Sequence, residues 1–228
     1  MSLPLDCIPS FLRGTPMRRW RRIYYDTFAP FYDGFVALHS HDRSDSARKF
    51  LTDLVPVQSG DSVLDICTGT GTLLTYLAAK AGAHGRVVGV DFSSGMLRKA
   101  SEKTRRWTNV RLVEADVTRL PFAAESFGAV TCSHAFYELK GPARERALRE
   151  IVRVLHPHGA FLMMEHEAPT KPVTKALFYL RLLVAGSGHA VAFLRQEEAL
   201  LAQFFATVEK VVAPGGRSKV LVCRKGCA

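Results

Sequence analysis

The sequence predicts an α/β fold built on a doubly wound, mostly parallel sheet of seven strands. Short runs rich in valine, leucine and isoleucine alternate along the chain with stretches of helical spacing. This alternation is typical of a parallel sheet covered by helices on both faces. Near the end of the chain, two further β-rich runs are separated by little more than Pro214-Gly215-Gly216. Because so short a connection forms a hairpin, we expect the last strand to run antiparallel.

Residues 1–59 precede the first expected strand, and we predict that they form an N-terminal helical cap. Pro30 separates two segments that combine tyrosine with aspartate. Between Ser46 and Val55, apolar residues then recur at the spacing of one helix face.

The strands are predicted at seven apolar or β-branched runs. These runs are 62–66, 86–91, 110–115, 127–133, 160–165, 207–212 and 219–224. Helices are expected after Gly71, after a serine cap at Ser93 or Ser94, and after Pro142.

The segment from Ala176 to Leu194 is the most apolar part of the chain. Arg181 and the run Gly186-Ser187-Gly188-His189 interrupt it, whereas a membrane-spanning helix needs about twenty nearly uninterrupted apolar residues. We therefore expect no spanning helix here. Two interpretations remain open: two core-facing segments joined by a glycine turn, or an apolar lid over an apolar substrate. We predict that residues 60–228 form one domain with this insert around 170–205.

Composition describes an ordinary globular chain. Its 228 residues are 47% hydrophobic and 23% charged, enough for one α/β domain with a substantial core. The five cysteines are odd in number and contain no CxxC pair, which favours a reducing cytoplasm and argues against a metal site. The N-terminal residues contain no continuous apolar run of the kind found in secretory signals. We expect a cytoplasmic protein.

The net charge of +10 is concentrated near the ends of the chain, with Arg18, Arg19, Arg21 and Arg22 surrounding Trp20. A solvated basic face is the commonest reason for such clustering. Basic residues beside an interfacial aromatic residue are also typical of contact with an anionic membrane surface. No nucleic-acid-binding module is recognisable, so a peripheral membrane contact ranks above nucleic acid.

Two strand ends indicate a nucleoside cofactor. The run Val63–Gly71 combines an apolar strand, an acidic residue near its end and a glycine turn, and Val87–Asp91 is a second strand that ends in a carboxylate. Glycines let the backbone approach a ligand closely, and a carboxylate at the end of the next strand suits the two hydroxyls of a ribose.

A dinucleotide fits this turn poorly. The G-x-G-x-x-G pattern places a third glycine three residues after the second, and Leu74 stands there instead. Asp65 would repel a pyrophosphate but attract an ammonium group. S-adenosylmethionine (SAM) carries an ammonium, a sulfonium and a ribose but no phosphate, so it is the cofactor we predict.

Four blocks in order resemble class I SAM-dependent methyltransferases, over the chain from about residue 60 onward. They are Val63–Gly71, Val87–Asp91, Glu114–Phe122 and Arg153–Gly159. The resemblance implies a seven-stranded methyltransferase sheet and S-adenosylhomocysteine as product. Residues 24–26 and 31–33 resemble the segment that closes over SAM in methyltransferases of ubiquinone and menaquinone biosynthesis. Cys67 departs from the pattern, because many members have a glycine there.

We expect the cofactor at the carboxyl ends of the strands. Asp65 should meet the amino group, Asp91 the ribose hydroxyls and Asp116 the adenine amine, while Phe92 and Met96 pack on the adenine. The predicted cofactor residues are Asp65, Cys67, Thr68, Gly69, Gly71, Asp91, Phe92, Met96, Asp116, Val117 and Ser133.

Methyl transfer from a sulfonium mainly needs alignment of the acceptor and exclusion of water. A base is needed only where the acceptor loses a proton. The predicted catalytic residues are His134, Tyr137 and His166, with His134 first because an imidazole titrates near neutrality. Glu138, Glu165 and Glu167 are further candidates for the base. A histidine that only contacts the cofactor or its own loop is an equal alternative.

We therefore expect a SAM-dependent methyltransferase of a small or lipid-linked hydrophobic acceptor, such as a quinol ring carbon. The alternatives are an N- or O-methyltransferase of an amine, phenol or phospholipid head group, and a methyltransferase-like binding protein without turnover. An NAD-linked reductase is opposed by the missing glycine.

Overall fold

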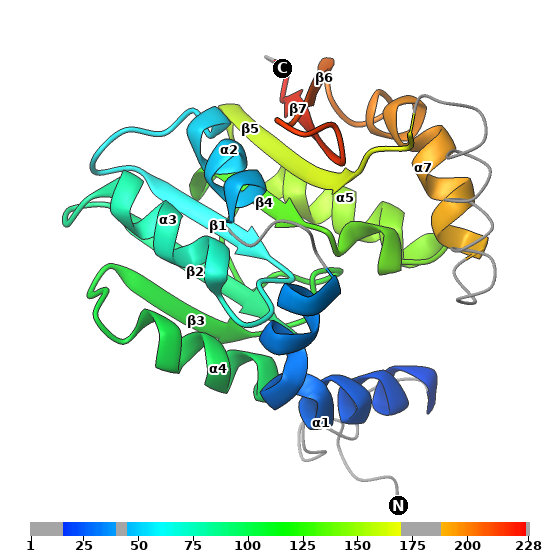
Figure 1. Cartoon of the computed structure of the whole chain (residues 1–228). Coiled ribbons are helices and arrows are strands. Elements are labelled where there is room, and N and C mark those ends of the chain that lie inside the picture. Colours follow the sequence, from blue (N-terminus) through cyan, green and yellow to red (C-terminus); the bar gives the residue numbers. More distant parts are fainter. Residues whose placement is uncertain (1–15, 40–44, 170–187, 227–228) are drawn as a thin grey trace, which may run out of the picture.

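The computed structural model describes residues 16–39, 45–169 and 188–226. Its centre is a seven-stranded sheet in the order β3-β2-β1-β4-β5-β7-β6 (Figure 1). The first five strands pair in parallel, and β7 pairs antiparallel with both β5 and β6. The doubly wound sheet and its antiparallel C-terminal hairpin are thereby confirmed.

The strands lie close to their predicted runs. Their bounds are β1 Ser62–Ile66, β2 Arg86–Asp91, β3 Val110–Glu114, β4 Phe127–Ser133, β5 Leu155–His166, β6 Thr207–Val212 and β7 Ser218–Arg224. Only β5 differs substantially, because it begins five residues earlier than Ala160, the residue at which it was predicted to start. Leu155 already pairs with Phe127, and the register then shifts before Ala129 pairs with Ala160.

Helices connect and cover these strands. Their bounds are α1 Pro16–His39, α2 Ser46–Leu54, α3 Thr72–Ala81, α4 Ser94–Thr104, the 3-10 turn η3 Phe136–Glu138, α5 Pro142–Val154 and α7 Gly188–Leu201. Ser93 is the N-cap of α4, because its side chain accepts a hydrogen bond from Met96 N, as predicted. Residues 170–187 of the apolar insert lie outside the described part of the chain.

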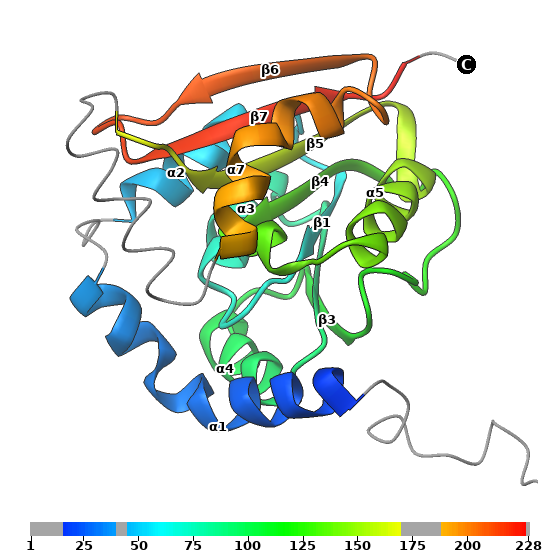
Figure 2. The same ribbon diagram turned by 90° about the vertical axis from the view of Figure 1, so that its right-hand side faces the viewer.

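Two buried layers cover opposite faces of the sheet. Side chains alternate along β5, so Phe161 and Met163 join one layer while Leu162 and Met164 join the other. The first layer includes residues of α5 and α7, and the second includes residues of α2 and α3. Figure 2 shows the sheet between α2 and α5.

Of the two helices before β1, α2 packs into the core and α1 lies beside α4. Leu51 of α2 and Val55 just after it are buried in the same layer as Leu74 of α3. Helix α1 instead crosses the molecule beside α4, and it bends along its length (Figure 1). Pro30 lies inside α1 and removes one helical hydrogen bond, a common cause of such bends. Within the described residues, no helix is long and apolar enough to span a bilayer.

Candidate functional site

The carboxyl ends of β1 and β2 meet at one rim of the sheet. Asp91, the last residue of β2, is buried, and each of its oxygens accepts a backbone hydrogen bond. Gly69 N donates to Oδ2 over 2.9 Å, and Ser93 N donates to Oδ1 over 2.9 Å. One carboxylate therefore fixes both predicted cofactor loops while lone pairs remain for ligand hydroxyls.

Asp65 lies inside the same rim and is 2% exposed. Its Oδ2 accepts from the Thr68 hydroxyl at 2.5 Å, and its Oδ1 accepts from the Thr131 hydroxyl at 2.7 Å. Burial raises the pKa of Asp65 to about 7, the negative charge of Asp91 adds to the rise, and the two hydroxyls oppose it. A cation bound here would favour the ionised form of Asp65.

The glycine turn between β1 and α3 has a left-handed backbone. Gly69 has φ 56° and Gly71 has φ 78°. At Gly71 a Cβ atom would also lie 2.8 Å from the Cβ of Ala100, so both conformation and space require glycine. Cys67 has φ 53°, a left-handed conformation that glycine adopts without the steric cost of a Cβ atom. The cysteine holds a conformation that costs an L-residue about 1–2 kcal/mol.

Helix α1 is attached to these loops by three polar side chains. Asp26 Oδ1 accepts from Ser93 Oγ at 2.6 Å and from Gly95 N at 2.8 Å. Asp33 Oδ1 accepts from Thr70 Oγ1 at 2.6 Å, and Asp33 Oδ2 binds the Lys103 ammonium at 2.8 Å.

Arg22 makes the third attachment. Its guanidinium donates to the carbonyl oxygen of Phe92 at 2.7 and 2.9 Å and pairs with Glu114. Gly95 admits this helix, because a Cβ there would lie 2.7 Å from the Cα of Asp26.

Three tyrosines extend the rim between α1 and η3. The Tyr25 ring meets the Phe92 ring edge-on at 5.7 Å. Burial raises the pKa of Tyr32, and the charge of Asp91 adds to the rise. Burial likewise raises the pKa of Tyr137, where Tyr25 and Tyr32 contribute. Tyr25, Tyr32, Tyr137 and Asp91 therefore lie near enough to influence one another electrostatically.

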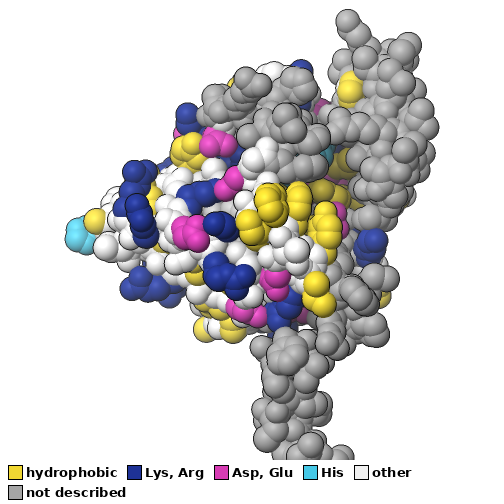
Figure 3. All heavy atoms as spheres, turned by 60° about the horizontal axis from the view of Figure 1, so that its bottom comes forward, with side chains coloured by type: hydrophobic (Ala, Val, Ile, Leu, Met, Phe, Trp, Pro, Cys, Tyr) yellow, Lys and Arg dark blue, Asp and Glu magenta, His cyan; other side chains and the backbone are white. Residues whose placement is uncertain are grey.

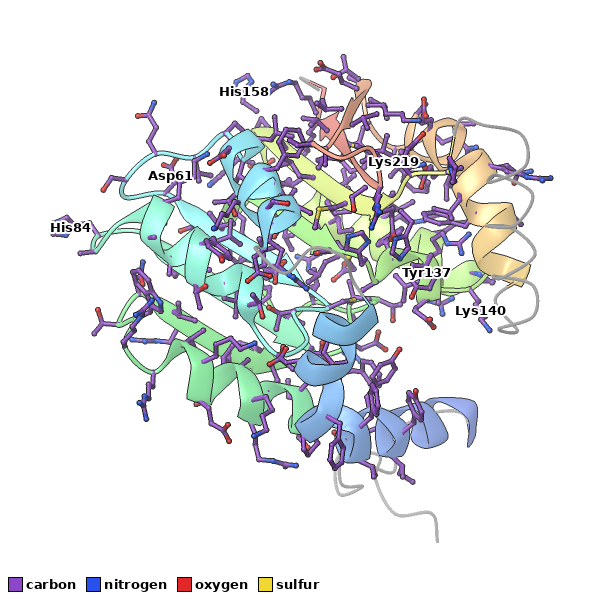
Figure 4. The ribbon with its side chains drawn as sticks, in the orientation of Figure 1. Asp61, His84, Tyr137, Lys140, His158 and Lys219 are labelled. Atoms are coloured by element: carbon purple, nitrogen blue, oxygen red, sulfur yellow. The ribbon has the colours of Figure 1, made fainter. Side chains whose placement is uncertain are left out.

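The two predicted catalytic histidines lie together. The rings of His134 and His166 are 4.5 Å apart, centroid to centroid. His134 N donates to Met164 O at 2.8 Å, and its Nε2 lies 3.4 Å from Ser218 Oγ on β7. With φ 51°, His134 turns the chain sharply after Ser133. Figure 4 shows Tyr137 on this side of the molecule and His84 and His158 at distant edges.

One of the further candidate bases, Glu165, is a buried carboxyl group beside these residues. Glu165 is 0% exposed, and its Oε1 accepts from Tyr137 N at 3.2 Å. Its Oε2 has no hydrogen-bond partner among the described residues. Burial raises the pKa of Glu165 to about 8, and the charge of Glu197 adds to the rise. The run Glu165-His166-Glu167 at a strand end was the available signal.

Behind Glu165 lies a buried ion-pair network. Lys219 of β7 is 4% exposed and Glu197 of α7 is 2% exposed, and the two form an ion pair. Glu167 also pairs with Lys219, at 3.3 Å, and with Lys210, at 2.7 Å. This network could not be predicted from the sequence, because the partners of a lysine in an apolar strand become visible only when β7 is placed beside β5.

The remaining predicted cofactor residues lie along the same rim. Asp116 follows β3, and its Oδ1 accepts from Thr118 N at 2.9 Å, so it shapes its own turn. Met96 is buried at the start of α4, and Val117 is buried in the layer that also contains Phe136. Their contacts with a cofactor stay predictions.

Comparison with known proteins defines the class. A family model described as a methyltransferase domain matches residues 63–159. The chain belongs to the class I SAM-dependent methyltransferases, and SAM is its cofactor.

Among the similar curated proteins are two demethylmenaquinone methyltransferases. The one from Staphylococcus haemolyticus (strain JCSC1435) is 34% identical over 174 residues, which cover 75% of this chain and 72% of that protein. The one from Staphylococcus aureus (strain JH9) is also 34% identical over 174 residues, covering 75% of this chain and 71% of that protein.

Solved structures agree on the fold. A SAM-dependent methyltransferase from Aquifex aeolicus superposes with a TM-score of 0.60 at 20% identity, covering 84% of this chain and 97% of that chain. The cyclase SpnF superposes with a TM-score of 0.61 at 17% identity, covering 91% and 96%. Because a protein called a cyclase shares the fold, the fold alone does not determine the reaction.

The rim has the chemistry that SAM requires. When bound, SAM supplies an electrophilic methyl group on a cationic sulfur. Asp65 is a buried carboxyl group that a cation would stabilise in its ionised form, and Asp91 retains lone pairs for ribose hydroxyls. We expect Asp65 to hold the ammonium group, Asp91 the ribose, and the Gly69–Gly71 backbone to lie against the methionine part.

Proposed function

We propose that this enzyme methylates a ring carbon of a lipid-linked quinol. The observation that carries the proposal is a set of proton-accepting groups, Glu165, His134 and His166, beside an aromatic rim and next to the cofactor loops. The 34% identity to proteins named demethylmenaquinone methyltransferases supports the same acceptor.

The chemistry explains why such groups are needed. A quinol ring carbon becomes nucleophilic when its hydroxyl group gives up a proton to a base. The carbon then takes the methyl group as the carbon–sulfur bond breaks, leaving a neutral thioether. The methylated carbon loses its own hydrogen as a proton, which restores the aromatic ring. The raised pKa of Glu165, about 8, makes its ionised form a stronger base than an ordinary carboxylate, and the ionised fraction grows as the pH rises toward 8.

Tyr25, Tyr32 and Tyr137 serve orientation rather than proton transfer in this scheme. Burial raises the pKa values of Tyr32 and Tyr137 above that of an ordinary phenol. Their rings can stack against a flat acceptor and exclude water from the methyl group. Correct alignment of acceptor and donor contributes several kcal/mol to such a displacement.

The test uses a short-chain naphthoquinol, kept reduced, that carries deuterium at the unsubstituted ring carbon. Carbon methylation replaces the deuteron, whereas oxygen methylation retains it, so mass spectrometry of the product separates the two. We expect a SAM-dependent product that has lost the deuteron. A product that retains it would make the enzyme an O-methyltransferase.

An amine and a phospholipid head group serve as competing acceptors in the same assay. Product from either one, with none from the quinol, would refute the quinol proposal. Binding of S-adenosylhomocysteine without turnover of any acceptor would favour a non-catalytic protein.

A further inference from the structure

The outward side of α1 is apolar. Ile23 is 47% exposed, Tyr24 is 59% exposed and Phe31 is 69% exposed. Among the described residues, the only other large hydrophobic side chain with comparable exposure is Val212, at 48% in β6. Figure 3 shows hydrophobic side chains gathered on this face of the molecule.

Helix α1 buries Ala29 and half-buries Tyr25 and Tyr32, yet it also exposes large apolar side chains, unlike an ordinary surface helix. Such a helix buries its apolar stripe and exposes its polar one. In α1 the polar residues Arg22, Asp26 and Asp33, spaced four and seven residues apart, bind the loops after β1 and β2 and the start of α4. Ile23 and Phe31 occupy another side of the helix. The arrangement therefore leaves an apolar surface that needs an apolar partner.

Positive charge beside the apolar surface of α1 indicates what kind of partner this surface would bind. Residues 98–106 on and after α4, which lies next to α1, contain five cations and one carboxylate. Arg98, Arg105 and Arg106 among them are exposed. Figure 3 shows Lys and Arg side chains beside the hydrophobic patch. Apolar and aromatic residues next to exposed cations match a surface of anionic lipid.

We propose that α1 is a membrane-docking helix. Ile23, Tyr24 and Phe31 enter the boundary between head groups and acyl chains, and the exposed Arg98, Arg105 and Arg106 contact anionic head groups. Tyrosine suits this depth, because its ring is apolar and its hydroxyl stays hydrated. The inner side of the same helix holds the cofactor loops, so docking places the cofactor site next to the bilayer. The proposal does not depend on the identity of the methyl acceptor.

Vesicle co-sedimentation of the full chain tests the proposal. Vesicles of phosphatidylcholine alone are compared with vesicles that also contain phosphatidylglycerol, without any methyl acceptor. The wild-type protein should sediment with the anionic vesicles and much less with the neutral ones. The double variant Ile23→Ser/Phe31→Ser should weaken binding by about tenfold or more, because two large apolar side chains no longer leave water.

Val212→Ser is the matched control, because it removes a hydrophobic side chain of similar exposure from β6. It should bind anionic vesicles as the wild type does. Each variant is also titrated with S-adenosylhomocysteine, so that a folding defect or a failure of the cofactor site is recognised separately.

Three results would overturn the proposal. The first is no binding of the wild type to vesicles of either composition. The second is binding that salt abolishes but the α1 variant leaves unchanged. The third is a wild-type dimer that the α1 variant dissociates, measured by light scattering, because a second copy would then cover this surface.

Discussion

We expect Asp65 to make cofactor affinity depend on pH. Its pKa in the free protein is raised to about 7, chiefly by burial, so below pH 7 it holds a proton that an ammonium ligand must displace. Affinity for S-adenosylhomocysteine should therefore rise with pH between about 5.5 and 8, by up to tenfold per pH unit below 7. Calorimetry in buffers of different ionisation enthalpy should detect proton release at pH 6.

Asp65→Asn should remove this pH dependence and weaken binding at pH 8 by about tenfold or more, since a charge-assisted hydrogen bond contributes about 1.5–3 kcal/mol. Asp61→Asn is the control, because Asp61 is exposed just before β1, at the opposite end of the strand (Figure 4). A pH slope that survives in Asp65→Asn would assign the titration to another group.

Cys67 has a strained backbone, and the cost of cysteine rather than glycine at this position can be measured as a free energy of unfolding. Its φ of 53° is unfavourable for cysteine by about 1–2 kcal/mol, while glycine gains about 0.5–1 kcal/mol of unfolded-state freedom. Cys67→Gly should therefore raise the free energy of unfolding slightly, by about 0.5–1 kcal/mol, and leave S-adenosylhomocysteine affinity equal or tighter. Denaturant titration gives the first quantity and calorimetry the second. A clear loss of stability would mean that the packing of the thiol outweighs its strain.

At the scale of elements, strands were predictable and long-range attachments were not. The apolar runs of β1, β2 and β4 set their bounds, because a parallel strand buried on both faces must be apolar throughout. The early start of β5 was missed, because Pro157 and Gly159 suggested a turn although Leu155 already pairs with Phe127. A pattern of neighbours along the chain carries no information about a partner across the sheet.

Prediction of the site was limited in the same way, because contacts between residues far apart in the sequence are not visible in it. The positions of Asp65, Gly71 and Asp91 at the strand ends were predictable, because their motif is contiguous with its strands. The attachment of Asp26 to Gly95 joins residues 69 positions apart, and the Lys219–Glu197 pair becomes visible only once β7 and α7 are in place. Which side chains of α1 are exposed likewise depends on which side of the helix meets α4, and the sequence does not reveal this contact.

Helix α1 should control cofactor retention through its inward carboxylates. Asp26→Ala removes the acceptor of two hydrogen bonds from the loop after β2, each contributing about 0.5–3 kcal/mol. We expect weaker binding of S-adenosylhomocysteine, by about tenfold, with faster dissociation in stopped-flow measurements. Glu102→Gln on the exposed side of α4 is the control. Unchanged dissociation in Asp26→Ala would show that α1 does not retain the cofactor.

Among the described residues, four carboxyl groups are buried: Asp65, Asp91, Glu165 and Glu197. Burial raises the pKa of each, to about 7 for Asp65 and Glu197 and about 8 for Glu165. Such groups bind protons more tightly in the folded chain than in the unfolded one. Their stabilising contribution is therefore complete below pH 4 and is lost as pH rises toward 8.

Glu165→Gln isolates the largest part of this effect. For Glu165 the difference between its ordinary pKa of 4.5 and about 8 corresponds to roughly 5 kcal/mol at most. The wild-type free energy of unfolding should fall between pH 5 and pH 8.5, and Glu165→Gln should flatten that fall. The variant should be the more stable protein at pH 8.5 and close to the wild type at pH 5, as measured by denaturant titration. Glu198→Gln, on the exposed side of α7, should follow the wild type.

The same variant separates stability from catalysis. If Glu165 accepts the proton of the acceptor, Glu165→Gln should lower kcat by about a hundredfold or more, in line with the loss of a general base, and shift the pH profile. Affinity for S-adenosylhomocysteine should stay within about twofold of the wild type, because Glu165 belongs to the acceptor side. A more stable variant with full kcat would assign the proton to His134 or His166 and leave Glu165 as a buried group that only lowers stability at high pH.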